Sequence, residues 1–475
     1  MARTRRSTEP FEVEITSLLP PGFGVASDPD GRPIRVRGAP PESRQLIQIN
    51  GRQKGELLAR RIAMVRPPPD AVVPRCAVFG LCGGCTLQEL SPERQRAHRH
   101  QFAMEAVRGP SPVAGVQEHP PTPASPTWSY RNRVELSFGV RQYVSEADHL
   151  AGAPVEGRFL GFHAPGRFDR VVDTGRCEIA GEPMNAVIEV ARAMLLHPDA
   201  PPPWDNRAHV GALRYLQVRH APSTHELLVA LFTTSDPAGT GVEAAAAAFA
   251  EALLSLPPDR ARVVGVEWVV DDGVADVARG ETRRTWGRPW LEEQLGAARL
   301  RISRTSFFQT STIGAARLYD IVGDALGAGG TLLDLYCGAG SIGLYLGGRF
   351  DRTFGVEVVP EAVADAAANA AASGVEAEYA AARVEDVPAL LADHPRPVRV
   401  VVDPPRAGLH PVAARAIAAL EADVLVYVAC HAPSLGRDRA ALEAGGWRLT
   451  DLWTVDLFPH TGHVEVVARF TRSAA

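Results

Sequence analysis

The stretch DLYCGAGSIGL, residues 334–344, decides the fold of this chain. It follows an apolar run and predicts a strand that ends at Asp334, then a glycine turn and the start of a helix. From about residue 305 onward, apolar β-branched runs alternate with Ala-rich helical segments. Strands that alternate with helices indicate βαβ units, so we expect a parallel, doubly wound sheet in this part of the chain.

The glycine turn favours a bound nucleoside. Gly338 and Gly340 let the backbone approach a ligand, and the following helix adds the dipole of its N-terminus. Glu357 ends the next strand, where an acidic side chain can bind both hydroxyls of a ribose. The turn, GAGSIG, departs from the GxGxxG pattern of nicotinamide-binding folds. A nucleoside without a pyrophosphate, such as S-adenosylmethionine, fits it better; a tight turn that binds nothing is the alternative.

Three reactive side chains belong to the strands that follow. Asp403, in VVVDPPRAGL (400–409), leaves the carboxyl end of a buried strand, and Cys430, in YVACHAPSLGRD (427–438), ends the next strand. These two residues should therefore be neighbours at one sheet edge, where open α/β folds bind ligands. Glu465 lies in an apolar strand, where a carboxylate is costly unless it is paired or functional. Core packing for the cysteine and an edge or surface position for the glutamate are the alternatives.

A cysteine cluster, CAVFGLCGGC (76–85), has the spacing C-x5-C-x2-C. Thiolates so close together in a Gly-rich loop can converge on one soft metal centre. Outside the C-terminal domain, Cys177 is the one cysteine left to act as a fourth ligand. Three cysteines plus one favour an iron–sulfur cluster, and zinc or unligated cysteines are the alternatives. A disulfide framework is not expected in a chain of 475 residues without a secretory signal.

Composition sets the class of protein. Hydrophobic residues make up 45% and charged residues 22% of the chain, as in ordinary globular proteins. No apolar run is long enough to span a membrane, and the basic start lacks an apolar signal region, so we expect a cytoplasmic protein. The net charge is −5, but residues 1–66 hold 12 Arg and Lys against 7 Asp and Glu. This uneven charge is compatible with a local basic module that steers a polyanion.

The chain divides into three expected parts. Short strand-like runs and Gly/Pro/Asp turns predict a small β-barrel in residues 1–70. Residues 71–300 hold the cysteine cluster, a charged helix over 88–108, a Pro/Ser-rich break at 109–127 and a mixture of strands and helices. Residues 301–475 form the α/β domain, on which the charged helix is expected to pack.

Taken together, these features resemble the RNA uracil-C5 methyltransferases of the large-subunit rRNA type over nearly the whole chain. Characteristic stretches occur in the family's order: CAVFGLCGGC, YRNRVELSFG, SFFQTS, DLYCGAGSIGL, DPPRAGL and FPHTGHVE. The resemblance implies an N-terminal TRAM domain, which is an OB-like RNA-binding barrel with a basic turn around Lys54. It also implies a central α+β RNA-binding domain and a C-terminal Rossmann-like class I methyltransferase domain.

The resemblance further implies S-adenosylmethionine-dependent methylation of C5 of a uridine in 23S rRNA, through a covalent adduct between cysteine and C6. Cys430 would be the nucleophile and Glu465 the base that removes the C5 proton. The implied cofactor contacts are Gln309, Tyr336, Gly338, Gly340, Ser341, Glu357 and Asp403. The implied ligands of a 4Fe–4S cluster are Cys76, Cys82, Cys85 and Cys177.

The expected binding partner is therefore RNA, and the protein is expected to be a monomer. The T-loop uridine of tRNA is the alternative substrate. The sequence departs from the family at two places. His431 and Ala432 stand where the family has Asn-Pro, and Arg383 stands where an Asp or Asn often contacts the adenine. A catalytically silent RNA-binding protein is a further alternative. A radical methylthiotransferase would need C-x3-C-x2-C, which this chain lacks.

Overall fold

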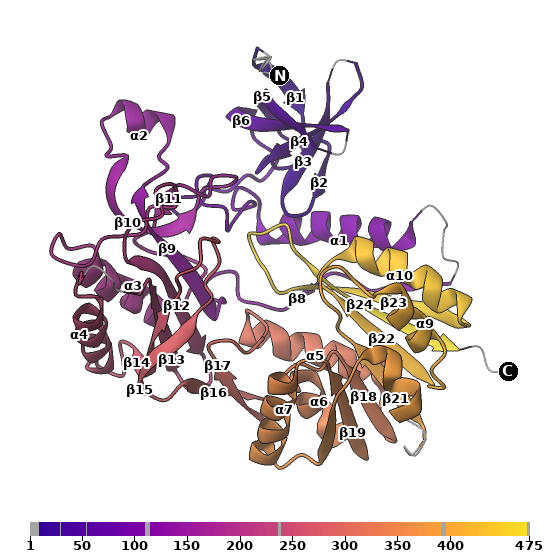
Figure 1. Ribbon diagram of the computed structural model, residues 1–475. Helices are drawn as coiled ribbons and strands as arrows, with labels where there is room; N and C mark the ends of the chain where they lie inside the picture. The colour runs from indigo at the N-terminus through magenta and orange to yellow at the C-terminus, as the bar shows by residue number, and fades with distance from the viewer. Residues whose placement is uncertain are drawn as a thin grey trace.

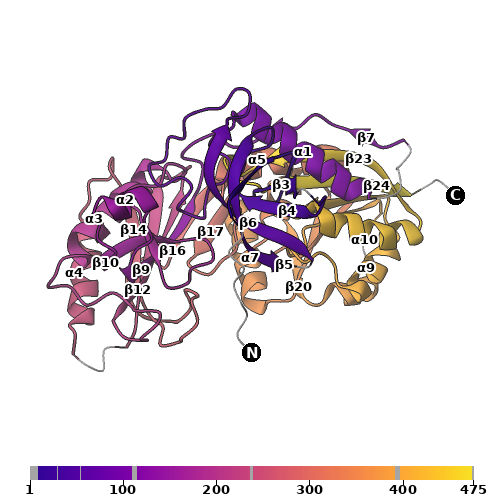
Figure 2. The ribbon, with the colours of Figure 1, turned by 90° about the horizontal axis from the view of Figure 1, so that it is seen from above.

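A computed structural model describes residues 9–28, 30–53, 55–109, 115–235, 239–390 and 396–472 (Figure 1). The described residues form three large sheets and one two-stranded hairpin. The N-terminal strands lie above helix α1 in Figure 1, and the view from above shows them near the middle of the molecule (Figure 2).

The N-terminal sheet has six strands in the order β1-β5-β6-β4-β3-β2. The strands are β1 (Phe11–Glu14), β2 (Ser17–Leu19), β3 (Phe23–Ser27), β4 (Pro33–Arg37), β5 (Arg44–Gln53) and β6 (Glu56–Arg66). Alternate residues point inward, and Ile34, Val36 and Ile47 are fully buried in one small core. Lys54, at the centre of the expected basic turn, lies outside the described residues.

Helix α1 (Pro92–Arg108) follows the cysteine segment and lies against the C-terminal domain. Ser91 caps its first turn and Pro92 occupies a first-turn position, where a missing N–H costs nothing. A Cβ atom on Gly436 of α10 would lie 2.2 Å from the carbonyl oxygen of Ala106, so the two helices approach closely. Three residues of α1 belong to the C-terminal core: Ala103, Met104 and Val107.

The Pro/Ser-rich break expected at 109–127 is not a free linker. Residues Gln117–Glu118 (β7) and Thr122–Pro123 (β8) both pair with β23 (Trp447–Asp456) of the C-terminal sheet. Short Pro-containing strands are tolerated at a sheet edge, because an edge strand needs only part of its hydrogen bonds. The segment from α1 to β8 therefore packs with the C-terminal domain, which was expected for the helix over 88–108 but not for the break that follows it.

The central sheet has seven strands in the order β11-β10-β9-β12-β13-β14-β15. They are β9 (Arg133–Arg141), β10 (Glu156–His163), β11 (Val171–Asp173), β12 (Leu213–Ala221), β13 (Glu226–Thr233), β14 (Arg262–Val270) and β15 (Glu281–Gly287). Helices α3 (Glu182–Leu195) and α4 (Val242–Leu254) cover its apolar face, and α2 (Glu146–Leu150) lies in an outer loop (Figure 1). On the opposite face, β9 carries the polar residues Arg133, Glu135 and Ser137, whereas β13 carries buried apolar residues such as Ala230 and Phe232.

The C-terminal sheet runs β20-β19-β18-β21-β22-β24-β23-β7, with β8 beside β23. Its remaining strands are β18 (Thr331–Leu335), β19 (Arg352–Glu357), β20 (Ala377–Ala381), β21 (Val398–Val402), β22 (Val424–Ala429) and β24 (Glu465–Arg472). The first five strands in this order are parallel, as the sequence predicted. β24 is antiparallel to both β22 and β23, because a short loop joins β23 to β24 and parallel strands need a longer crossover.

Helices cover both faces of this sheet and produce the two largest cores. They are α5 (Thr312–Leu326), α6 (Ser341–Leu346), α7 (Pro360–Ser373), α8 (Val387–Leu390), α9 (Pro411–Ala418) and α10 (Ala432–Ala444), with 3-10 turns η1 (Gly347–Arg349) and η2 (Val384–Asp386). The hairpin β16 (Trp290–Leu295) and β17 (Ala298–Ser303) packs into the core on the α5 side. None of the helices in the described ranges is long and apolar enough to cross a membrane.

Candidate active site

The carboxyl ends of the parallel strands carry most of the predicted site residues. Tyr336 follows β18, Glu357 ends β19, Asp403 follows β21 and Cys430 follows β22. These strands are direct neighbours in the order β19-β18-β21-β22, so their ends form one edge. The sequence prediction that Asp403 and Cys430 share this edge is confirmed.

The glycine turn after β18 is fixed by its neighbours. Gly340 has a φ of +82°, and a Cβ there would lie 2.8 Å from the hydroxyl of Tyr379. The Gly338 N–H donates to the Glu357 carboxylate at 3.3 Å, and the buried Asn369 amide donates to the Ala339 carbonyl at 3.1 Å. Both contacts hold the turn open toward the sheet edge, where its backbone can approach a ligand.

Buried carboxyl groups give this edge a strong preference for a positive or hydroxyl-rich ligand. Asp334 is 1% exposed, and its Oδ2 accepts from the Gly343 N–H at 2.9 Å. Burial, then the charges of Asp403 and Glu357, raise the pKa of Asp334 to about 7. Burial also raises the pKa of Asp403 to about 7.

The remaining predicted cofactor residues lie on α5 and α6 or just before them. Ser341 begins α6, and its hydroxyl lies 3.0 Å from that of Tyr319 on α5. Gln309 is buried three residues before α5, and its carbonyl accepts from the Asn132 side chain at 2.9 Å. Arg383, the departure from the family pattern near the adenine, is exposed at the start of η2.

Cys430 and Glu465 are brought together by strand register. Ala429 of β22 pairs with Val466 of β24. Cys430, which follows Ala429, and Glu465, which precedes Val466, therefore lie at the same end of the two strands. Glu465 is 2% exposed, and burial followed by the charge of Asp403 raises its pKa to about 8, against the opposing effect of Arg406. Burial, then the charges of Glu465 and Asp403, raise the pKa of the Cys430 thiol to about 11.

Arg406 supplies the positive charge of this site. It lowers the pKa of both Cys430 and Glu465, and its Nη1 lies 3.3 Å from Nδ1 of His463. His431 does not take this role, because burial and then the charges of Arg406 and Arg437 lower the pKa of its ring and keep it neutral.

At the Asn-Pro departure, the hydroxyl of Ser434 lies 2.7 Å from the His431 carbonyl and 3.3 Å from that of Arg406. This side chain links the two loops that carry Cys430 and Asp403. The loop with His431 and Ala432 is therefore anchored by α10, although it lacks the family's Asn-Pro pair.

The four predicted cluster cysteines lie around one space. Cys76, Cys82, Cys85 and Cys177 line a cavity of about 170 Å³. Burial is the main cause that raises the pKa of all four thiols, and for Cys85 the pKa reaches about 12. Within the described ranges, no group of three or more His, Cys, Asp or Glu side chains has the arrangement of a metal-ion site.

Several buried polar residues near the active site escaped sequence reasoning. Arg99 and Gln95 of α1, Asp456 at the end of β23, and Asn132 are all buried. Gln95 and Arg99 lie four positions apart, on the α1 face that also buries Ala103. That spacing was the one available signal, since a polar residue continuing an apolar helical stripe needs partners in the core.

The fold and this edge define the class of S-adenosylmethionine-dependent methyltransferases with a Rossmann-like domain. The sequence pattern of the family described as tRNA (Uracil-5-)-methyltransferase matches residues 294–472. A protein of Chlorobaculum tepidum described as an uncharacterized RNA methyltransferase is 33% identical over 98% of this chain and 93% of its own length. The chain belongs to the RNA (uracil-C5)-methyltransferase family, whose members use S-adenosylmethionine.

Two further comparisons concern one archaeal relative. The tRNA (uracil(54)-C(5))-methyltransferase of Pyrococcus abyssi is 29% identical over 96% of this chain and 98% of its own length. Its crystal structure in complex with S-adenosyl-L-homocysteine matches with a TM-score of 0.74 and 26% identity, covering 97% of this chain and 99% of that one. The similarity therefore extends over all three sheets and not only over the methyltransferase domain.

Proposed function

We propose that this enzyme methylates C5 of an RNA uridine through a covalent adduct, with Cys430 as nucleophile and Glu465 as base. The observation that carries the proposal is the register of β21, β22 and β24, which brings a thiol, a buried carboxyl and Asp403 to one end of the sheet. The Cys430 thiol can act as a nucleophile once it is deprotonated. The Glu465 carboxyl, with a pKa of about 8, can lose and regain a proton near neutral pH, as a base must.

The Cys430 thiolate adds to C6 of uracil, and the electrons of the C5–C6 double bond move into an enolate, which makes C5 nucleophilic. S-adenosylmethionine, when bound, supplies the methyl group that C5 takes up. Glu465 then removes the C5 proton, the double bond forms again, and the bond between C6 and the Cys430 sulfur breaks.

The target base has to leave its stack to reach the thiol, as in other enzymes that act on bases. Gln309, Tyr336, Ser341, Glu357 and Asp403 are the proposed cofactor contacts, with backbone access at the two glycines of the turn. Glu357 fits ribose hydroxyls, because its carboxylate already accepts from the Val358 and Val359 N–H groups and lies beside the turn.

We propose that Cys76, Cys82, Cys85 and Cys177 hold a 4Fe–4S cluster. The support for this proposal is that the four side chains line one cavity of about 170 Å³ and are all thiols, although they do not have the arrangement of a metal-ion site in this structure. Their raised pKa values mean that thiolates need a strong positive partner at this place, which iron would supply. Four protein ligands leave no iron open for substrate, so the proposed role is structural.

We propose that RNA lies along all three parts of the protein, which works as a monomer. These parts are the barrel of residues 1–70, the central domain of 71–300 and the methyltransferase domain of 301–475. A cationic site on the central sheet supports RNA contact. Arg219 is 4% exposed and pairs in register with Arg133, and burial followed by the charges of Arg133 and Arg304 lowers its pKa to about 9. Glu135, which pairs with Arg133 at 3.2 Å, offsets part of the repulsion between these like charges, and we propose that an RNA phosphate offsets the rest.

We propose 23S rRNA as the substrate, on the family resemblance of the cysteine cluster and the N-terminal barrel. The T-loop of tRNA is the second candidate, because the Pyrococcus abyssi relative acts on uracil 54 of tRNA. Mapping of 5-methyluridine in both RNAs from a deletion strain distinguishes the two substrates. If both RNAs keep all their 5-methyluridines in this strain, the proposed activity is refuted.

A second experiment tests the nucleophile. RNA that carries 5-fluorouridine cannot lose a proton from C5, so it should trap the enzyme covalently after methyl transfer. We expect trapping by the wild type and none by Cys430→Ala, whereas trapping by Cys430→Ala would refute the assignment.

A further inference from the structure

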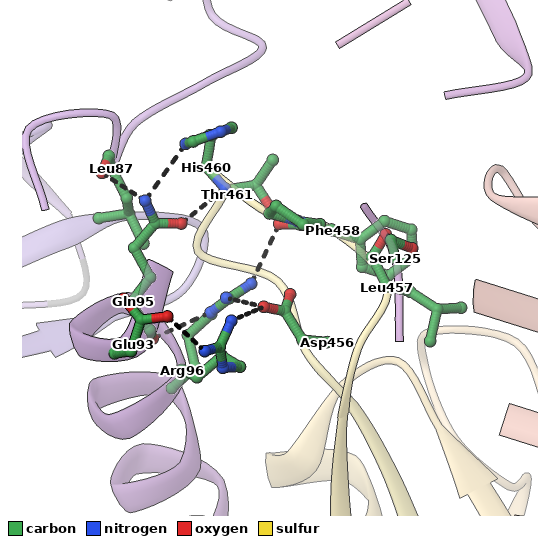
Figure 3. Close-up of polar contacts among 12 residues, drawn as sticks. Leu87, Glu93, Gln95, Arg96, Ser125, Asp456, Leu457, Phe458, His460 and Thr461 are labelled. Carbon is green, nitrogen blue, oxygen red and sulfur yellow. Dashed lines mark hydrogen bonds and ion pairs between the residues drawn. The ribbon is translucent and has the colours of Figure 1, made fainter. Parts of the chain in front are cut away.

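The turn that precedes Glu465 is held from outside the methyltransferase domain. This turn, Phe458–His463, connects β23 to β24 and ends two residues before the proposed base. Helix α1, the segment after Cys85, and Tyr130 all donate hydrogen bonds to it. Figure 3 shows the side chain of Gln95 directed at His460 and the carboxylate of Asp456 directed at the arginines of α1.

Arg99 makes three contacts, two with the ends of the turn and one with the strand that leads into it. Its Nη1 donates to the carbonyls of Phe458 and His463 at 3.0 Å each, which span the two ends of the turn. Its Nη2 forms an ion pair at 2.9 Å with Asp456, the last residue of β23. The Arg99 side chain is 2% exposed, so these contacts replace its hydration and leave it little freedom.

Gln95, one helical turn earlier, holds the middle of the same turn. Its Oε1 accepts from the His460 N–H at 2.7 Å, and its Nε2 lies 3.2 Å from Nδ1 of the same residue (Figure 3). His460 has a φ of +68°, which is uncommon for a residue other than glycine. Such a conformation persists only where the surroundings impose it, and it is often found near functional sites.

Other segments complete the contact. The N–H groups of Thr86 and Leu87 donate to the His460 carbonyl at 2.8 and 3.0 Å, directly after Cys85. The hydroxyl of Tyr130 donates to the Pro459 carbonyl at 3.0 Å. The backbone of the turn is therefore fixed by side chains and N–H groups that its own domain does not supply.

We propose that Arg99 and Gln95 are positioning residues for the base, because they fix the Phe458–His463 turn and through it the carboxyl of Glu465. The inference rests on the proposed role of Glu465. It predicts a selective defect: removal of the C5 proton slows, while attack by Cys430 and methyl uptake continue.

The test uses the full-length enzyme with ordinary RNA and labelled S-adenosylmethionine, and it measures the covalent enzyme–RNA species on a denaturing gel. In the wild type this species should not accumulate, because elimination is fast. Arg99→Met should slow elimination by about 10- to 100-fold, as expected for a misplaced catalytic group, and a methyl-labelled adduct should accumulate. With 5-fluorouridine RNA, the same variant should form adduct at the wild-type rate.

Stability is separated from positioning by two further variants. Arg99→Met leaves the buried Asp456 with only the longer ion pair to Arg96, at 3.9 Å, whereas Arg99→Met with Asp456→Asn removes both charges of the close pair and should recover the melting temperature but not the elimination rate. Gln95→Leu disturbs the turn without touching the ion pair, and it should also accumulate adduct.

Arg439→Met is the matched control. Arg439 is a half-buried arginine of α10 that donates to the Val107 and Arg108 carbonyls at the far end of α1 and pairs with Glu443. We expect no adduct from this variant. Wild-type elimination in both Arg99→Met with Asp456→Asn and Gln95→Leu would overturn the inference. Absence of adduct in Glu465→Gln would instead overturn the proposed base.

Discussion

The pH dependence of proton removal is the sharpest consequence of the site. A carboxyl acts as a base only when it is ionised, and the pKa of Glu465 is raised to about 8. At pH 7 about one Glu465 in eleven is therefore ionised, so elimination should be about tenfold slower than its plateau above pH 9. The rate should follow one ionisation, with its midpoint near pH 8.

The charged neighbours of Glu465 should move this midpoint in opposite directions. Arg406 lowers the pKa of Glu465, so Arg406→Gln should shift the profile to higher pH and reduce elimination at pH 7. Asp403 raises the same pKa, so Asp403→Asn should shift the profile to lower pH. Arg415→Gln, which changes an exposed arginine on α9, should leave the midpoint unchanged.

The assay is a single-turnover reaction with saturating RNA and cofactor, in which the methyl-labelled adduct is followed as it decays at each pH. Decay isolates proton removal from thiol attack, whose own pH dependence reflects Cys430. A decay rate that does not change between pH 6 and 9, or an Arg406→Gln profile displaced to lower pH, would refute the electrostatic argument.

Three further outcomes follow from the same contacts. Glu465→Gln should stabilise the protein more at pH 8.5 than at pH 5.5. The reason is that a buried carboxyl with a raised pKa stabilises the folded state at low pH and loses this contribution as the pH rises from 4.5 through 8. In urea unfolding, the change in the free energy of unfolding caused by the substitution should differ between the two pH values by an amount on the order of a few kcal/mol. Cys177→Ser should abolish bound iron in the purified protein, whereas Cys337→Ser, at the cofactor turn, should retain it. Arg219→Met should reduce the salt dependence of RNA affinity by about one phosphate contact, and an unchanged slope would remove Arg219 from the RNA path.

The active-site edge could be predicted from the sequence because it depends on local pattern. Apolar runs located β18, β19, β21 and β22, and the rule that ligands bind at the carboxyl ends of parallel strands brought Asp403 beside Cys430. The roles of Cys430 and Glu465 came from the family resemblance, and they stay a proposal.

The support of the site could not be predicted in the same way. Arg99 lies in a helix rich in charged residues, where an arginine normally faces solvent. Its burial depends on Asp456 and on the carbonyls of Phe458 and His463, which are more than 350 positions away in the sequence. Neither periodicity nor composition carries information on such a partner. For the same reason, the residues of β7 and β8 were expected to lie in a Pro/Ser-rich break and not in the C-terminal sheet.

The contacts around the turn give a physical reason why the N-terminal sheet and the C-terminal sheet occur in one chain. A Cβ on Gly462 would lie 2.3 Å from the backbone nitrogen of Gly22, so the β2–β3 connection of the N-terminal sheet touches the turn before Glu465 directly. The hydroxyl of Thr86 lies 3.4 Å from the Pro21 carbonyl, which joins the cysteine segment to the same place. The N-terminal sheet, in backbone contact with this turn, cannot shift without moving the proposed base or breaking the contact. Binding energy gained by RNA far from the uridine can then contribute to placing the carboxyl at C5, which is how remote contacts increase turnover as well as affinity.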